Sequence, residues 1–378
     1  MIKIHINYYK IIHFGFIIRL IIALWNGFLG PSFGAEGDAL NFHNVALDIL
    51  KNNKDFIFSF GWVYSYFLSY IYNLTLESLF IGSLISCFAW LISAYYLSKT
   101  INMLEVTEKN KIKIFLFYSL MPSSIFYTSV TLREVYQLLF INMSVFYIIS
   151  NTIKFNFVKI IKLFLSLVFL CVLHSALIAV ALYFILALIW IQSSKSKSYL
   201  SLNFLIGALI LIISSQYLLN IISTLSYKLD DGLSVAIQIY QEGSLATEAR
   251  AHYKDNVEIK GFFSLIYFIP INFFQYLFEP MPWRISAPID LISLIENIIR
   301  LYLIIYSFNS IIKFNSKSYK YKIVLFIFFS YLIIELIWSL GTTNWGTAMR
   351  HHIPSLGLLL ITAYAFSTNK SLNIKKYN

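Results

Sequence analysis

The sequence predicts an all-α fold: a polytopic membrane helix bundle of about ten transmembrane helices, with further helices lying on its outer face. Hydrophobic residues make up 58% of the 378 residues and charged residues only 12%. A soluble domain of this length could not bury so much apolar surface. Runs rich in Leu, Ile and Phe also recur along the whole chain rather than in one region. Composition and patterning therefore both indicate a membrane protein.

The predicted spans follow these apolar runs, each near the roughly 20 residues that cross a bilayer. They are 11–30, 77–98, 113–131, 134–152, 160–175, 176–194, 201–221, 289–312, 322–340 and 353–369. The first run ends in LWNGFLGPSF without a small-residue cleavage site, so we expect a retained span rather than a signal peptide. Cys87 and Cys171 both lie inside apolar runs, which argues against a disulfide framework.

The charge pattern predicts the orientation of these spans. A net charge of +11 could indicate a nucleic-acid partner, but the lysines gather in short segments between apolar runs, which is the positive-inside pattern. These segments are Lys99–Lys113, Lys154–Lys162, Lys195–Lys197, Lys313–Lys322 and Lys370–Lys376. We therefore predict a multi-pass membrane protein with both termini cytoplasmic and no nucleic-acid partner.

Two long segments are left on the outer side and divide the chain into three parts. These are an N-terminal transmembrane module, 1–221, with an outer loop at 31–76; an outer region, 222–288, with an interfacial helix; and C-terminal helices, 289–378. The run 57–73 is apolar enough to span, but a crossing there would put the lysines of Lys99–Lys113 outside. We expect it to lie in the interface. Because most carboxylates and arginines fall on the outer side, we expect the chemistry there.

The stretch GAEGDALNFHNVAL places Glu36, Asp38 and His43 just after the first span. Asp38 could cap the helix that follows, or it could act as a general base whose pKa is raised by burial and by Glu36. A divalent cation held by these three residues is a further alternative, although no recognised ligand spacing is present. We expect no cofactor and no resident metal.

His43 is a candidate substrate-binding residue, and two other clusters supply further candidates on the same side. Arg133 and Glu134 in TLREVYQLLF could form a salt-bridged turn, with the arginine snorkelling, or an anion clamp. In NWGTAMRHHIPSL, Arg350 and His351 form part of a basic cluster that suits a phosphate-bearing ligand, and Arg284 in MPWRISAP would add to it.

The layout resembles integral-membrane glycosyltransferases of the GT-C class. The resemblance lies in an acidic residue in the first outer loop, outer interfacial helices before the second span and a late outer region. GAEGDALNFHNVA, LREVYQLLF, FEPMPWRIS and GTTNWGTAMRHH also resemble membrane proteins of bacterial surface-polysaccharide clusters, including Wzy-type O-antigen polymerases. The resemblance implies a protein of the bacterial inner membrane that catalyses an inverting reaction with Asp38 as catalytic carboxylate. It also implies polyprenyl-linked saccharide donor and acceptor, membrane lipids, and a chain-length regulator protein as partners.

The class often shows an Asp-Asp or Asp-Glu pair where this chain has Glu-Gly-Asp, so the role of Glu36 stays open. The expected activity is that of an O-antigen or related surface polysaccharide polymerase. A single-sugar transferase with a polyprenyl-monophosphate donor is the alternative enzyme. A flippase or transporter is the alternative from another class, and it would favour polar groups at the membrane midplane rather than at one face.

Overall fold

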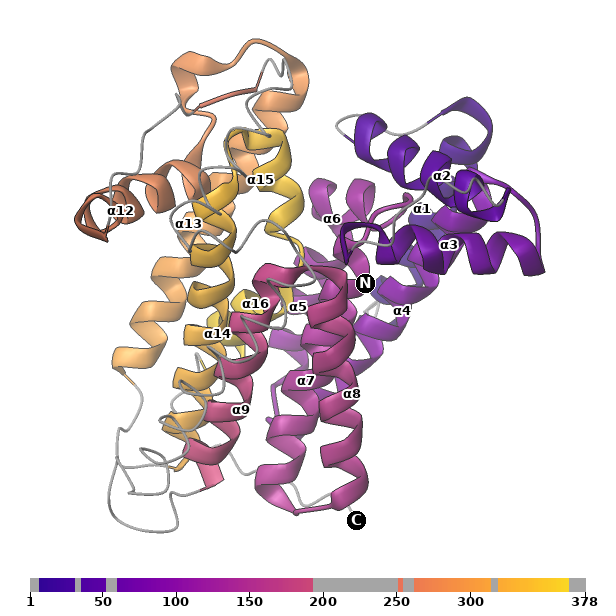
Figure 1. Ribbon diagram of the computed structural model, residues 1–378. Coiled ribbons are helices and arrows are strands. Elements are labelled where there is room, and N and C mark those ends of the chain that lie inside the picture. The colour runs from indigo at the N-terminus through magenta and orange to yellow at the C-terminus, as the bar shows by residue number, and fades with distance from the viewer. Residues whose placement is uncertain are drawn as a thin grey trace, which may run out of the picture.

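The computed structural model describes residues 7–30, 35–51, 60–192, 251–253, 262–313 and 319–366 (Figure 1). The predicted span 201–221 and most of the polar part of the outer region lie outside these residues. Within the described ranges every regular element is a helix, in agreement with the predicted all-α class. The helices are α1 Tyr8–Leu29, α2 Glu36–Leu50, η1 Phe60–Trp62, α3 Val63–Leu74, α4 Leu79–Met103, α5 Glu108–Leu120, α6 Pro122–Tyr127, α7 Glu134–Ile153, α8 Phe157–Leu173, η2 Ser175–Leu177, α9 Ile178–Gln192, α12 Phe262–Phe278, η4 Pro282–Arg284, α13 Pro288–Ile312, α14 Tyr319–Gly341, α15 Trp345–His351 and α16 Leu356–Tyr364.

Six of the described helical segments are long and apolar enough to cross a membrane. They are α1, α4, α7, the η2–α9 segment, α13 and α14, and each coincides with a predicted span. Outward-facing side chains support the same conclusion. Along α13 the exposed apolar residues recur every three or four positions, which gives one continuous apolar face toward the surroundings: Leu291, Ile295, Ile298, Leu301, Tyr302, Ile305, Phe308 and Ile312. The chain is a helical membrane protein.

Three of the predicted spans differ from the observed helices. The span 113–131 is wrong as a single helix, because Pro122 cannot continue α5 and the residue before it, Met121, is extended. The helix α8 has 17 residues and corresponds to 160–175. The last span, 353–369, is represented by the shorter α16, all of whose residues are buried at the centre of the bundle.

The interfacial segment before the second span is helical but short. Helix α3 has 12 residues, which gives a length of about 18 Å against roughly 30 Å of bilayer core. Figure 1 shows α2 and α3 lying across one end of the bundle, at the upper right, while α7, α8, α9 and α14 run lengthwise. We call the end that carries α2 and α15 the upper end, and the end with the α7–α8 connection the lower end.

Candidate functional site

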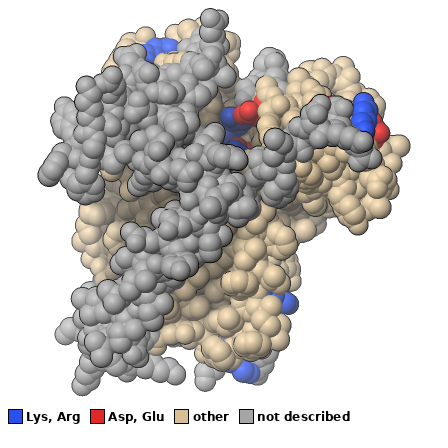
Figure 2. Space-filling model, in the orientation of Figure 1, with Lys and Arg blue, Asp and Glu red and all other residues tan. Residues whose placement is uncertain are grey.

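An ion pair at the upper end joins two segments far apart in the sequence. Nη1 of Arg350, in α15, contacts Oδ2 of Asp38, in the first turn of α2. The Arg350 side chain is 9% exposed, whereas the Asp38 side chain is 51% exposed. In Figure 2 acidic and basic atoms meet at the upper centre of the molecule. One face of the carboxylate is therefore held by a buried guanidinium while the other is open.

Helix α2 is fixed from beneath by hydrogen bonds to its backbone. The Thr131 hydroxyl donates to the carbonyl of Ala39 at 3.0 Å, and the Ser65 hydroxyl donates to the carbonyl of Phe42 at 3.0 Å. The small side chain of Ala39 is fully buried, which lets the first turn pack closely on the bundle. These contacts determine where the carboxylate of Asp38 lies.

Asp38 is not the cap of its helix, so that interpretation of the sequence is wrong. Helix α2 begins at Glu36, its cap is Ala35, and no side-chain hydrogen bond caps it. Asp38 is the third helical residue, where a carboxylate is favoured by the positive end of the helix dipole. Its side chain is thus directed to Arg350 rather than to its own backbone.

Helix α15 is short and is held by polar contacts at its first turn. The Asn344 side chain accepts a hydrogen bond from the Thr347 amide at 2.7 Å and so caps the helix. The indole of Trp345 donates to Oδ1 of Asp290 at 2.9 Å, while Oδ2 of Asp290 accepts from the amide of Ala287 at 2.9 Å. Asp290 therefore links α15 to the start of α13.

The expected electrostatics of Asp38 are reversed in the structure. The neighbouring Arg350 guanidinium lowers the pKa of Asp38 below its ordinary value, which outweighs the opposing effect of burial, and Arg133 lowers it further. The carboxylate of Asp38 raises the pKa of Arg350 against the opposing effect of burial. In the free protein Asp38 is a stable carboxylate and a weak base, and not the base with a raised pKa that the sequence suggested.

Arg133 and Glu134 approach this pair from the start of α7. Arg133 contributes to the field at Asp38 and lies 5.5 Å over the ring of Phe42 in α2. Glu134 is 4% exposed, and its charge contributes to the raised pKa of Arg350. No ion pair joins Arg133 to Glu134 themselves, so the salt-bridged turn is not present. The two residues belong to the same electrostatic cluster as Asp38 and Arg350.

Arg350 retains hydrogen-bonding capacity for a further partner. One terminal nitrogen, Nη2, donates to the hydroxyl of Thr347 at 3.4 Å. The buried Nε has no hydrogen-bond acceptor among the described residues. Oε2 of Glu134 is likewise buried without a donor in the described part of the chain. A buried arginine nitrogen without an acceptor is unusual, and a rearrangement that opens the Asp38–Arg350 pair would let an anionic ligand use it.

Other predicted site residues are held elsewhere. Nδ1 of His43 lies 2.9 Å from the hydroxyl of Tyr72. Arg284 pairs with Oε1 of Glu279 at 3.5 Å on the α12–α13 connection. The side chain of Glu36 lies outside the described residues, so its tuning role and the cation alternative remain predictions.

The adjacent histidines are structural neighbours of the site rather than added positive charge. His351 stacks on Trp338 with a 4.0 Å centroid distance, and its Nδ1 lies 2.9 Å from the Thr342 hydroxyl. Burial, reinforced by Arg350, lowers the pKa of His351 well below its ordinary value. The imidazole is therefore neutral at pH 7, which corrects its assignment to a basic phosphate-binding cluster.

A second buried cluster lies in the C-terminal helices, and the sequence did not indicate that His352 and Ser355 belong to it. Nδ1 of His352 lies 2.5 Å from Oε2 of Glu335, and the hydroxyl of Ser355 donates to the other carboxylate oxygen. These residues line a cavity of about 10 Å³ together with Arg300 and Tyr331. Glu335 and Arg300 were recognisable as ionisable residues within spans, but their partners were not.

Comparisons of the chain with protein-family models, with curated proteins and with solved structures give no match. The chemistry available at the site comes from its own residues. It consists of a half-exposed carboxylate, a buried guanidinium with an unused nitrogen, and a second arginine nearby. Together these groups can accept a proton and bind an anion.

Proposed function

We propose that the protein is a membrane glycosyltransferase that uses polyprenyl-(di)phosphate-linked sugars at the upper end of the bundle. We assign it as an O-antigen or related surface polysaccharide polymerase with a GT-C-like arrangement of about ten spans. The observation that carries the proposal is the Asp38–Arg350 pair, which places a proton acceptor in contact with an anion-binding group. Arg133 provides the second positive charge beside it.

In the proposed reaction an acceptor hydroxyl attacks the anomeric carbon of the donor sugar. The new carbon–oxygen bond forms as the bond between the anomeric carbon and the phosphate oxygen breaks, and the lipid phosphate leaves. Asp38 takes the hydroxyl proton, while Arg350 and Arg133 stabilise the charge of the leaving phosphate in a site of low dielectric. Attack opposite the leaving group inverts the configuration at the anomeric carbon.

The lowered pKa of Asp38 fits this reaction if the donor disrupts the resting ion pair. A phosphate bound to Arg350 would compete with Asp38 for the guanidinium and would add negative charge beside the carboxylate. Both effects raise a carboxyl pKa. Asp38 would then become a stronger base only when the donor is present.

A transporter or flippase is the second candidate, because ionisable residues also lie inside the C-terminal helices. Arg300 in α13 and Glu335 in α14 are both buried and line one small cavity. Intramembrane ionisable groups are typical of transport pathways. Loss of a transport protein and loss of a polymerase would leave the lipid-linked intermediate on different leaflets of the membrane, which distinguishes the two functions.

Deletion of the gene in its host tests these alternatives with one assay. A polymerase defect shortens surface polysaccharide to single repeat units, with lipid-linked units accumulating on the outer leaflet. A transport defect leaves the lipid-linked units on the inner leaflet, inaccessible to a periplasmic hydrolase. A single-sugar transferase defect leaves chain length unchanged and removes one sugar mass from a glycolipid. Either of the last two results would contradict the polymerase assignment.

The proposed orientation puts the upper end in the periplasm and both termini in the cytoplasm. On the visible face in Figure 2, only basic atoms colour the described lower part of the molecule. Thr75, after α3, and Thr107, before α5, are both exposed and lie at opposite ends of α4. An impermeant maleimide should label Thr75→Cys in spheroplasts, and should label Thr107→Cys only after permeabilisation. The reverse pattern would overturn the orientation.

A further inference from the structure

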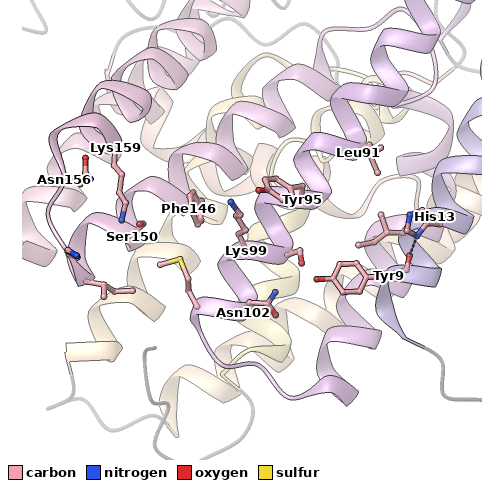
Figure 3. A pocket seen from close by; sticks show the side chains of 15 residues that line it. Tyr9, His13, Leu91, Tyr95, Lys99, Asn102, Phe146, Ser150, Asn156 and Lys159 are labelled. Carbon is pink, nitrogen blue, oxygen red and sulfur yellow. Dashed lines mark hydrogen bonds between the residues drawn. The ribbon is translucent and has the colours of Figure 1, made fainter. Parts of the chain in front are cut away.

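A large pocket lies at the lower end, opposite the Asp38–Arg350 site. It has a volume of about 790 Å³ and is formed by the ends of α1, α4, α7 and α8 (Figure 3). This volume falls within the range of small-molecule sites, roughly 300–1,000 Å³. Helix α7 alone, with its 20 residues, separates the two regions by about 30 Å. The pocket is therefore separate from the Asp38–Arg350 ion pair and from the reaction proposed there.

The charged side chains among the described residues that line this pocket are all basic. Lys99 from α4, Lys154 after α7 and Lys159 from α8 all contribute to the wall, and no aspartate or glutamate is among the described residues that line it. In Figure 3 the amino groups of Lys99 and Lys159 approach the same space from two sides, with Phe146 between them. None of the three lysines has an ion-pair partner among the described residues, in contrast to Lys111, which pairs with Glu108 at 2.7 Å.

The Lys99 ammonium is positioned by aromatic rings rather than by a carboxylate. Its Nζ lies 4.5 Å from the ring centroid of Tyr95 and 5.7 Å from that of Phe146. Such cation–π contacts hold the ammonium in place while leaving its hydrogen-bond donors available. The aromatic rings thus fix the position of the Lys99 ammonium without neutralising its charge.

The face of α4 that carries Lys99 continues as an apolar surface toward the membrane interior. Phe88, Ile92 and Tyr95 are 48%, 47% and 52% exposed, and they precede Lys99 at helical spacing. The distance from Phe88 to Lys99 along the helix is about 16 Å. Lys99 therefore lies at one end of an apolar strip on the same exposed face of α4.

We propose that this pocket binds the phosphate headgroup of an anionic membrane lipid, with an acyl chain of that lipid lying along Phe88 and Ile92. Basic pockets between transmembrane helices on the cytoplasmic side suit lipid phosphates, and three uncompensated lysines supply the charge. The apolar strip favours a lipid over a soluble phosphate, because it is exposed at the level of the hydrocarbon. The proposal does not depend on the glycosyltransferase assignment.

Native mass spectrometry of the full-length protein in detergent tests the headgroup. Dioleoylphosphatidylglycerol and dioleoylphosphatidylcholine have the same chains and differ in net charge, so the first should be retained and the second should not. Each lysine near an anionic headgroup contributes about fivefold in affinity, so Lys99→Gln with Lys159→Gln should weaken retention about 25-fold. Lys10→Gln with Lys109→Gln removes the same charge from exposed positions outside the pocket and should leave retention unchanged.

Equal retention of the two lipids, or equal loss in both double variants, would overturn the proposal. Displacement of the lipid by excess inorganic phosphate would assign the pocket to a soluble phosphate compound instead. Should the glutamine variant fail to fold, a phosphatidylglycerol with a photoreactive acyl chain provides a test on the wild-type protein. Crosslinks should fall on the α4 peptide that contains Phe88 and Ile92, and crosslinks confined to other helices would refute the assignment.

Discussion

The two ends of the helix bundle hold their charged side chains in opposite ways. At the upper end Asp38 and Arg350 neutralise each other, and the pair joins α2 to α15. At the lower end Lys99, Lys154 and Lys159 line a cavity, and the described residues around it include no carboxylate. An anion entering the lower pocket meets charge that is already available, whereas an anion reaching Arg350 must displace Asp38.

This difference indicates what each region can do. Uncompensated lysines suit a resident anion such as a lipid headgroup, because binding requires no rearrangement. At the Asp38–Arg350 pair, anion binding is coupled to release of the carboxylate, because a ligand that binds the arginine separates Asp38 from it. Such coupling is useful in a reaction in which the base is needed only when the leaving group is in place. The predictions below test whether the upper pair has that role.

The largest effect is expected from Asp38→Asn. Asparagine is nearly the same shape but cannot take a proton, and loss of a general base lowers rates about 100- to 10,000-fold. Complementation of the deletion strain should therefore give no long-chain polysaccharide, with membrane protein level measured in parallel. Asp48→Asn, at an exposed carboxylate on the same helix, is the matched control and should complement fully. Long polymer from well-expressed Asp38→Asn would remove Asp38 from the mechanism, leaving His43 and Glu134 as the next candidates.

A smaller effect is expected from Arg350→Lys. The charge is kept, but the two-pronged hydrogen-bonding geometry is lost, and charge-assisted hydrogen bonds contribute about 1.5–3 kcal/mol. Polymer synthesis by purified protein should fall about 10- to 100-fold. Arg133→Lys should give a similar or milder defect. Arg284→Lys should give the mildest, because its guanidinium is held at Glu279. Equal activity of Arg350→Lys, Arg350→Ala and wild type would reduce Arg350 to a structural residue.

The long apolar helices are predictable from the sequence, whereas the contacts within the site are predictable only in part. Hydropathy identified α1, α4, α7, α9, α13 and α14, because a membrane helix must satisfy its own backbone and be apolar for its whole length. The break at Pro122 was visible in the sequence but was subsumed in an apolar run. Proline disfavours a helical conformation for the residue before it, so Pro122 is a sequence signal for the end of α5.

The partners within the site could not be predicted in this way. The sequence marks Asp38 and Arg350 each as a candidate functional residue, but nothing in it indicates that they contact each other. Their contact depends on how α2 and α15 pack at the end of the bundle. For the same reason the reversal of the Asp38 pKa was not predicted, and neither was the burial of His351 against Trp338. Long-range packing determines both.

The smallest effect is the dependence of stability on acid. The pKa of Asp38 is lowered in the folded chain, so its pairing contributes fully above the ordinary carboxyl pKa of about 3.9 and is lost as pH falls below that value. Because the carboxylate is half-exposed, solvent screening limits the contribution to about 1 kcal/mol or less. The thermal midpoints of wild type and Asp38→Asn in detergent should therefore differ at pH 7, and the difference should shrink as pH falls below about 3.9. A difference that persists or grows in acid would contradict the ion-pair assignment.

The most direct test of the account exchanges the two charges. In the double variant Asp38→Arg with Arg350→Asp, an ion pair can form again between α2 and α15, but the base and the anion-binding group have changed places. Because the ion pair is restored, the double variant should recover membrane protein level and thermal midpoint relative to the single charge reversals. If the pair also acts in chemistry, this recovery should not extend to activity. The double variant should still make no long polysaccharide. Restoration of wild-type polymer length by the exchanged pair would show that Asp38 and Arg350 serve only to join the two helices.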